Sequence, residues 1–190
     1  MILRRFMKDV VLPVAVAIAL AFLIQGAVAK PYQIPTGSMI PTIGEGDRVI
    51  ANRLIYKFRD IQRGDIIVFH PTIEAKGSCG IPADDGTPFV KRVIGLAGDT
   101  VIVEEGKREV SINGVPFDVP AAALNPGQGR DESLPSKTFQ VPQGKIFVMG
   151  DNRPNSCDSH LWTDPFVPID AVVGQAEVTY WPIRHLTFLK

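Results

Sequence analysis

A long uncharged stretch close to the N-terminus limits what this chain can fold into more than any other feature. Arg4, Arg5 and Lys8 precede it, and residues 10–29 contain no acidic or basic side chain. As a helix, about 20 apolar residues cross roughly 30 Å of hydrocarbon, and a cationic flank stays in the cytoplasm. We therefore expect residues 1–9 to form a cytoplasmic N-terminus and residues 10–29 a single transmembrane helix. Residues 30–190 would then form a domain on the extracytoplasmic side of the plasma membrane.

The same stretch also has the features of a cleavable signal peptide. A cationic start and an apolar centre are followed by the small-residue pattern Ala27-Val28-Ala29. Under either interpretation, the chain after Lys30 is delivered across the cytoplasmic membrane. The chemistry of the residues that follow favours a retained anchor, and self-cleavage after Ala29 stays open.

Charge and ligand patterns exclude several functions. The chain has 20 Lys and Arg residues against 20 Asp and Glu residues, so no basic field favours nucleic acid as a partner. Its histidines, His70, His160 and His185, have no HxxxH or CxxC spacing. We therefore expect neither a metal ion nor another cofactor.

The only two cysteines, Cys79 and Cys157, both lie in the exported part of the chain. An oxidising compartment permits a disulfide, and a pair of unpaired thiols is the alternative. Because each cysteine lies in a loop punctuated by Gly or Pro, we expect a disulfide between them.

Short apolar runs separated by turn residues make up the exported part. These runs are rich in Val, Ile, Phe and Tyr and are bounded by Gly, Pro, Asn or Asp, which predicts a mostly β, antiparallel domain after the N-terminal transmembrane helix. Asn113-Gly114 between strand-like flanks predicts a hairpin. Two loop-rich insertions, at about 72–87 and 116–136, are expected at the periphery, and a short helix could follow Pro168 over residues 169–173.

Ser38 lies in "PTGSMIPTIGEGD" (residues 35–47), which is too rich in Gly and Pro for a regular element. Most serines in such loops are solvated turn residues, and a nucleophilic serine needs a base. One possible base is His160, oriented by Asp151 or Asp158, although no GxSxG motif supports this triad.

Lys91 is the other possible base, because it lies in the strand-like run "FVKRVIG". Strand alternation points Lys91 and Arg92 to opposite faces, so one of the two cations should face the interior. Burial can lower a lysine pKa from about 10.4 to about 7, at a cost of roughly 4 to 5 kcal/mol. The alternative is that both cations lie at a sheet edge with their charged ends in water.

Four stretches together resemble the motifs of bacterial type I signal peptidases, in order and spacing. They are "TGSMIPTIGEGDRV" (36–49), "RGDIIVF" (63–69), "FVKRVIGLAGD" (89–99) and "VMGDNRPNSCDS" (148–159). The resemblance implies a membrane-bound serine endopeptidase with a Ser/Lys dyad. Such an enzyme removes N-terminal signal peptides from exported preproteins after small residues, at A-x-A sites, through an acyl-enzyme. Its implied partners are preproteins and the lipid bilayer.

The resemblance also implies roles for individual residues. Ser38 would be the nucleophile and Lys91 the general base, with Ser156 orienting the lysine by a hydrogen bond. The Ser38 backbone N–H and the Thr36 hydroxyl would form the oxyanion hole. The remaining implied residues are Asp151, Arg153 and Asp158, which support the site, and Met39 and Ile40, which line the substrate cleft.

Some of these positions carry further expectations. For Arg153 and Asp158 we expect an ion pair. Thr36 stands where the family often has serine, His160 replaces a more usual arginine, and Pro154 replaces an acidic residue. Lipid contact is possible for Ile40, Ile43 and Trp162, although core packing is the simpler expectation for Ile43.

Two other functions fit the same residues. One is a specialised relative that trims a single partner, such as a conjugation-pilus maturation protease. The other is a catalytically inactive, membrane-tethered β domain that only binds exported peptides. The joint presence of Ser38, Lys91 and Ser156 argues against the inactive domain.

Overall fold

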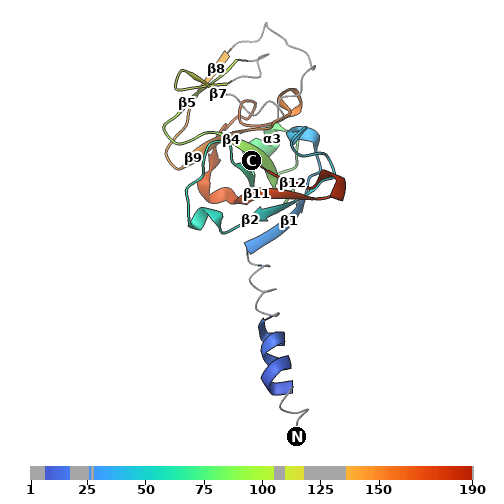
Figure 1. The fold of residues 1–190 in the computed structure, drawn as a ribbon. Helices are drawn as coiled ribbons and strands as arrows, with labels where there is room; N and C mark the ends of the chain where they lie inside the picture. The colour runs from blue at the N-terminus through green and yellow to red at the C-terminus, as the bar shows by residue number, and fades with distance from the viewer. Residues whose placement is uncertain (1–6, 18–25, 27, 105–109, 118–135, 190) are drawn as a thin grey trace.

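The computed structural model describes residues 7–17, 26, 28–104, 110–117 and 136–189. The N-terminal segment begins with the π-helical turn η1 (Met7–Val11), continues as α-helix to residue 17, and projects away from the β domain (Figure 1). Within the described ranges, no helix has both the length and the apolar character needed to cross a membrane. The expected anchor at 10–29 lies partly outside these ranges, and therefore stays a prediction.

The larger of two sheets has eight strands and carries the site. Its order is β1-β2-β11-β3-β4-β9-β10, with β12 paired to β11. The strands are β1 (Ala29–Gln33), β2 (Arg48–Asn52), β3 (Ile66–Phe69), β4 (Phe89–Gly95), β9 (Lys145–Met149), β10 (Val167–Pro168), β11 (Val172–Trp181) and β12 (Thr187–Phe188). Every pairing in it is antiparallel, as the sequence predicted.

The smaller sheet lies at the far end of the domain from the N-terminal segment (Figure 1). Its order is β7-β6-β5-β8, with β5 (Thr100–Glu104), β6 (Val110–Ile112), β7 (Val115–Phe117) and β8 (Ser136–Gln140). The predicted hairpin is confirmed: β6 and β7 are antiparallel, and positive φ angles of 53° at Asn113 and 81° at Gly114 form its tight turn.

Short helical turns connect the strands. They are η2 (Gly37–Met39), η3 (Ile55–Lys57), α3 (Ile73–Ser78), η5 (Arg153–Asn155), η6 (Ile169–Ala171) and η7 (Ile183–His185). The short helix expected at 169–173 is the 3-10 turn η6, and it ends earlier because Val172 begins β11. The insertion expected at 72–87 contains α3, capped by the Thr72 hydroxyl, which accepts from the Ala75 N–H at 3.2 Å. Most of the insertion expected at 116–136 lies outside the described residues.

Central strands of the larger sheet are buried on both faces. All of β3 is buried, and so is all of β4 after Phe89, because these strands lie between other strands and the hydrophobic clusters cover them. One cluster joins Ile34, Met39 and Ile43 to residues of β2, β3 and the C-terminal Leu189. The loop that carries Ser38 therefore rests on the main core.

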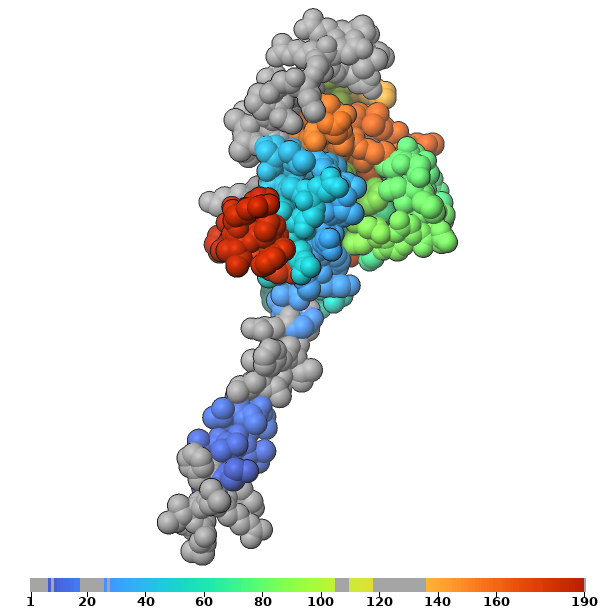
Figure 2. Space-filling model, turned by 90° about the vertical axis from the view of Figure 1, so that its right-hand side faces the viewer, coloured from blue at the N-terminus to red at the C-terminus, as the bar shows by residue number. Residues whose placement is uncertain are grey.

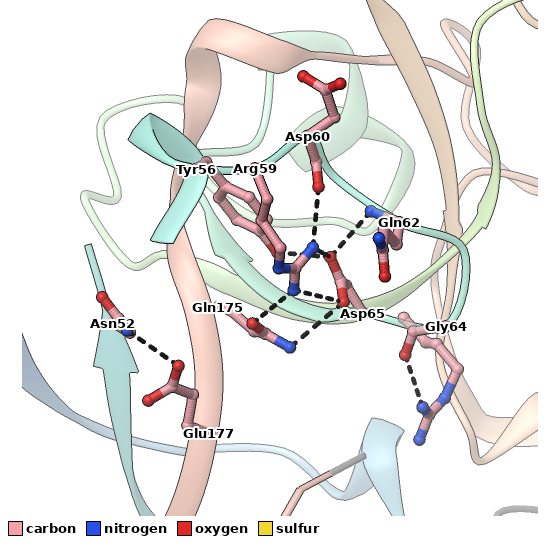
Figure 3. A network of polar contacts seen from close by, with 10 residues as sticks. Asn52, Tyr56, Arg59, Asp60, Gln62, Gly64, Asp65, Gln175 and Glu177 are labelled. Carbon is pink, nitrogen blue, oxygen red and sulfur yellow. Dashed lines mark hydrogen bonds and ion pairs between the residues drawn. The ribbon is translucent and has the colours of Figure 1, made fainter. Parts of the chain in front are cut away.

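A polar network fixes the start of β3 to β11 (Figure 3). Asp65 accepts two hydrogen bonds from the Arg59 guanidinium at 2.8 and 2.9 Å, and Gln175 of β11 bonds to both residues. The Tyr56 hydroxyl also donates to Asp65, at 3.1 Å. These contacts hold the chain just before β3, where the Gly64 carbonyl accepts from the Arg92 side chain at 2.8 Å.

Cys79 and Cys157 form a disulfide, with 5.8 Å between their Cα atoms. The bond joins the end of α3 to the turn that follows β9, and the Trp162 indole N–H donates to the Cys79 sulfur at 3.2 Å. The segment around Cys79 is therefore fastened beside the residues that follow η5.

Candidate active site

A cleft of about 500 Å³ opens beside β4, between two segments of the chain. One wall is the end of β1 and the chain that follows it, and the other is the segment between Cys79 and Val90. Its lining residues are Tyr32, Gln33, Ile34, Pro35, Thr36, Ser38, Cys79, Ile81, Asp85, Thr87, Pro88, Phe89, Val90, Lys91, Asn155 and Cys157. The 72–87 segment was expected at the periphery; most of its residues are indeed exposed or half-buried, but the segment also lines the cleft, where the disulfide fastens it.

Ser38 lines the cleft from the 3-10 turn η2, and only 7% of it is exposed. Its Oγ is 2.6 Å from Lys91 Nζ, and the Thr36 hydroxyl donates to the same oxygen at 3.3 Å. Thr36 precedes η2, but its side chain does not cap that turn. The Thr36 hydroxyl therefore lies beside the serine oxygen, available to a group bound there.

Lys91 reaches Ser38 from the central strand β4, and 5% of it is exposed. Burial lowers the pKa of Lys91 to about 8 from its ordinary 10.5, while the negative charges of Asp158 and Asp151 oppose this shift. An amine with this pKa is partly neutral near physiological pH and can accept a proton.

Arg92, the next residue on β4, is even more deeply buried, with 2% exposed. Its guanidinium donates two hydrogen bonds to Asp151, at 2.8 and 2.7 Å, and Thr42 donates to the same carboxylate at 2.6 Å. The expectation that only one of the two cations faces the interior is wrong: strand alternation does separate them, but β4 is covered on both faces. The alternative that both lie at a sheet edge is also wrong.

The expected hydrogen bond between Ser156 and Lys91 is not formed. Ser156 Oγ is buried, and among the described residues no partner reaches it in good hydrogen-bond geometry. Ser156 lies close to Asp158, and its hydroxyl helps to lower the pKa of that carboxylate. Lys91 Nζ instead points to Ser38.

Asp158 is fully buried and has two partners of its own. Its carboxylate contacts His160 Nδ1 at 2.5 Å and accepts from the Gly150 N–H at 2.8 Å. Burial alone would raise the pKa of Asp158, but the bond and charge of His160 and the charge of Lys91 hold it below its usual range. Within the described chain, His160 thus contacts Asp158, and the amine beside Ser38 is that of Lys91.

Arg153 lies in the same turn as Asp158. Burial lowers the pKa of its guanidinium, and the charges of Asp158 and Asp151 oppose that shift. The ion pair expected between Arg153 and Asp158 stays a prediction.

Two residues that sequence patterns did not single out lie against the Ser38 loop. The Asn152 backbone N–H donates to the Ser38 carbonyl at 3.0 Å, and its side-chain Nδ2 donates to the Gly37 carbonyl at 2.9 Å. Gly150 lies so close that a Cβ there would meet the Ser38 carbonyl oxygen at 2.4 Å and Ser156 Oγ at 2.2 Å. Both residues stand in the "GDN" run, but only their position in the fold reveals these contacts.

The apolar residues beside Ser38 lie differently from what we expected. Met39 does not line the cleft; it is fully buried in the core with Ile43. Ile40 is half-buried and is also absent from the cleft wall. Trp162 packs in the core beside Phe69 and Phe89, which leaves it no lipid-facing surface.

Comparison with known proteins agrees with this geometry. The family model described as "Signal peptidase, peptidase S26" matches residues 7–181, so the chain belongs to that family. The chain is thus a serine endopeptidase of the signal peptidase I type.

Among the residues described, no group of three His, Cys, Asp or Glu side chains could hold a metal ion.

Individual relatives cover most of the chain. A probable signal peptidase I-1 of Synechocystis sp. is 41% identical over 94% of this chain and 84% of its own length. A signal peptidase I of Leptolyngbya laminosa is 40% identical over 91% of this chain and 79% of its own length. A crystal structure of a signal peptidase I from Enterococcus faecalis V583 is 30% identical, with a TM-score of 0.46, and covers 62% of this chain and 97% of that one.

The low pKa of Lys91 makes the stability of the protein depend on pH. The unfolded chain takes up this proton near pH 10.5 and the folded chain only near 8, so the unfolded state binds more protons between these values. The free energy of unfolding should therefore rise by roughly 2 to 3 kcal/mol between about pH 7 and pH 10 through this group. Denaturant unfolding in detergent measures it, with Lys91→Met as the control that lacks the rise. Equal pH dependence in both proteins would contradict the buried-amine assignment.

Proposed function

We propose that this protein is a membrane-bound signal peptidase that removes N-terminal signal peptides from exported preproteins by acyl-enzyme chemistry. The observation that carries the proposal is the 2.6 Å contact between Ser38 Oγ and Lys91 Nζ in the lining of a cleft. Membership of the signal peptidase family and the names of the relatives support the substrate class.

The first half of the reaction forms the acyl-enzyme. Neutral Lys91 accepts the Ser38 hydroxyl proton while Ser38 Oγ attacks the scissile carbonyl carbon. The carbonyl oxygen becomes an oxyanion, which accepts from the Ser38 N–H and the Thr36 hydroxyl. The C–N bond then breaks, and the Lys91 ammonium gives its proton to the leaving amine.

The second half releases the signal peptide. Lys91, neutral again, accepts a proton from a water molecule that attacks the ester carbon. The ester C–O bond breaks, and the proton returns to Ser38 Oγ. Asp151, Arg153 and Asp158 support this cycle by fixing the surroundings of the lysine, with Ser156 beside Asp158.

The cleft favours an extended substrate with small side chains. Residues 33–36 and 85–90 form its two walls, and an extended peptide between them could pair with backbone groups as an added strand. Ile34 and Val90 are nearly buried and offer an apolar surface close to Ser38. Narrow apolar contact suits the small residues of an A-x-A site.

Membrane attachment places the cleft close to its substrates. We assign residues 1–9 to the cytoplasm, 10–29 to a single-pass anchor in the plasma membrane, and 30–190 to the extracytoplasmic catalytic domain. The C-terminal segment exposes Trp181, Ile183, Leu186 and Phe188 (red in Figure 2). Its strand β12 pairs with β11, and only β2 separates β11 from β1, where the anchor ends. Such an apolar surface suits contact with the outer lipid interface.

Removal of either member of the dyad should abolish processing. Ser38→Ala lacks the nucleophile and Lys91→Met lacks the base, so each should lower kcat by at least about 10³-fold, as for other residues that act as a unit. Cleavage of a signal-bearing precursor by the purified full chain in detergent measures this, with thermal unfolding as the folding control. Failure of the unsubstituted chain to cleave any A-x-A precursor would overturn the proposed function, and near-normal turnover by Lys91→Met would overturn the dyad.

Activity should increase with pH through the titration of Lys91. Because only the neutral amine accepts the Ser38 proton, kcat/KM should rise tenfold per pH unit below a midpoint near 8 and level off above it. A pH–rate profile with a soluble peptide substrate tests this. A flat profile between about pH 6 and pH 9, with chemistry limiting, is incompatible with this base.

The exposed C-terminal surface should matter only for membrane-inserted substrates. We expect Ile183→Ser combined with Phe188→Ser to lower cleavage of a precursor in vesicles several-fold and to leave cleavage of a soluble peptide unchanged. Val115→Ser is the matched control, since Val115 is similarly exposed but lies on the sheet farthest from the N-terminal segment. Equal effects on both substrates, or equal effects of the control, would refute lipid contact here.

A further inference from the structure

Asn152 holds both peptide groups that flank the Ser38 Cα atom. Its side-chain Nδ2 donates to the Gly37 carbonyl at 2.9 Å, and its backbone N–H donates to the Ser38 carbonyl at 3.0 Å. Asn152 is itself buried, with 5% exposed. One residue of the turn after β9 therefore fixes the backbone on both sides of the nucleophile.

The Gly37 carbonyl and the Ser38 N–H belong to the same peptide group. In a trans peptide these two bonds point in opposite directions, so the hydrogen bond that holds the carbonyl also sets the direction of the N–H. We propose that Asn152 is a positioning residue for the oxyanion hole, which aims the Ser38 N–H into the cleft. This inference rests on the oxyanion role given to Ser38 in the proposed function.

The Ser38 peptide needs such a restraint. Gly37 has no side chain to limit its backbone, so the peptide between Gly37 and Ser38 could rotate at little cost. The turn η2 is only three residues long, and its own contribution is the Ile40 N–H, which donates to the Gly37 carbonyl at 3.2 Å. The shorter bond from Asn152 comes from a different part of the fold, and it ties the peptide to the core.

The amide of Asn152 is itself oriented. Asn155 Nδ2 donates to Asn152 Oδ1 at 3.3 Å, which leaves Asn152 Nδ2 to face the Gly37 carbonyl. The preceding residue, Asp151, is held by Arg92 and Thr42. Consecutive residues of one turn thus serve different tasks: Asp151 lies near the base, and Asn152 holds the peptide that carries the proposed oxyanion donor.

Kinetics and a transition-state analogue together test this role. Asn152→Ala removes the side-chain donor, and Asn152→Asp replaces it with a carboxylate that repels the Gly37 carbonyl while keeping the size of the side chain. We expect kcat to fall by about 10- to 100-fold, less than the 10²- to 10³-fold loss of an entire donor, with KM within about threefold. The midpoint of the pH–rate profile should stay the same in Asn152→Ala, whereas the added negative charge in Asn152→Asp should raise the pKa of Lys91.

A peptide aldehyde gives a readout that is independent of turnover. Ser38 Oγ adds to the aldehyde carbon, Lys91 takes the hydroxyl proton, and the former carbonyl oxygen occupies the oxyanion hole. We expect affinity for this aldehyde to fall by the same factor as kcat in both variants. Affinity for the corresponding peptide alcohol, which forms no oxyanion, should be unchanged.

Asn52→Ala is the matched control. Asn52 is also a partly buried asparagine, whose side chain accepts from the Leu54 and Ile55 N–H groups and donates to Glu177, at the end of β2 away from the cleft. The Asn52→Ala protein should be less stable but should retain kcat and aldehyde affinity.

Three results would overturn the inference: unchanged kcat in both Asn152 variants, a loss of kcat without loss of aldehyde affinity, or a shifted pH midpoint in Asn152→Ala, which would mean that Asn152 acts on Lys91. If Asn152→Ala does not fold, the kcat of Asn152→Asp above its pH midpoint and its aldehyde affinity decide. Inactivity of the unsubstituted chain would instead refute the proposed function.

Discussion

The site depends on two consecutive buried cations of β4, Lys91 and Arg92, which have different bonding partners. Arg92 is neutralised by Asp151 through two short hydrogen bonds, and breaking such a buried pair typically costs about 3 to 5 kcal/mol. Lys91 contacts Ser38 rather than a carboxylate at bonding distance, and its pKa falls to about 8. Asp158 lies near enough to raise that pKa somewhat, but it bonds to His160 and Gly150 instead. Arg92 thus holds the structure together, while Lys91 remains able to lose its proton.

The turn after β9 connects the two cations to the loop that carries Ser38. Asp151 contacts Arg92, Asn152 holds the peptides around Ser38, and Cys157 fastens the opposite wall of the cleft through Cys79. Gly150 lets this turn approach the Ser38 carbonyl more closely than any side chain would allow. Because one short segment makes all of these contacts, a small displacement of the turn would disturb Ser38, the charge environment of Lys91 and the cleft together.

Short sequence patterns predicted the elements that neighbouring residues determine. Apolar runs separated by turn residues predicted an antiparallel β domain, and Asn113-Gly114 predicted the hairpin. The pair Ser38 and Lys91 came from motif resemblance, since no local rule relates residues from separate strands and loops. The burial of Arg92, the core position of Met39 and the contacts of Asn152 could not be predicted, because each depends on which segments cover β4 and η2 in three dimensions. The 72–87 segment has the polar, Gly-rich sequence typical of a peripheral loop. Its place beside the cleft is set by the disulfide and the adjoining strand β4, which no local pattern reveals.

The proposed mechanism requires that the buried amine next to Ser38 is neutral at the pH where the enzyme works. Direct titration of Lys91 tests it without reference to any substrate. NMR of the full chain in detergent micelles, with lysine labelled at Cε and Nζ, would follow each side chain through a pH series, and the spectrum of Lys91→Met would assign the signal. We predict a midpoint of about 8 for Lys91. A midpoint near the ordinary lysine value of 10.5 would mean that Lys91 stays charged and would contradict its role as a base.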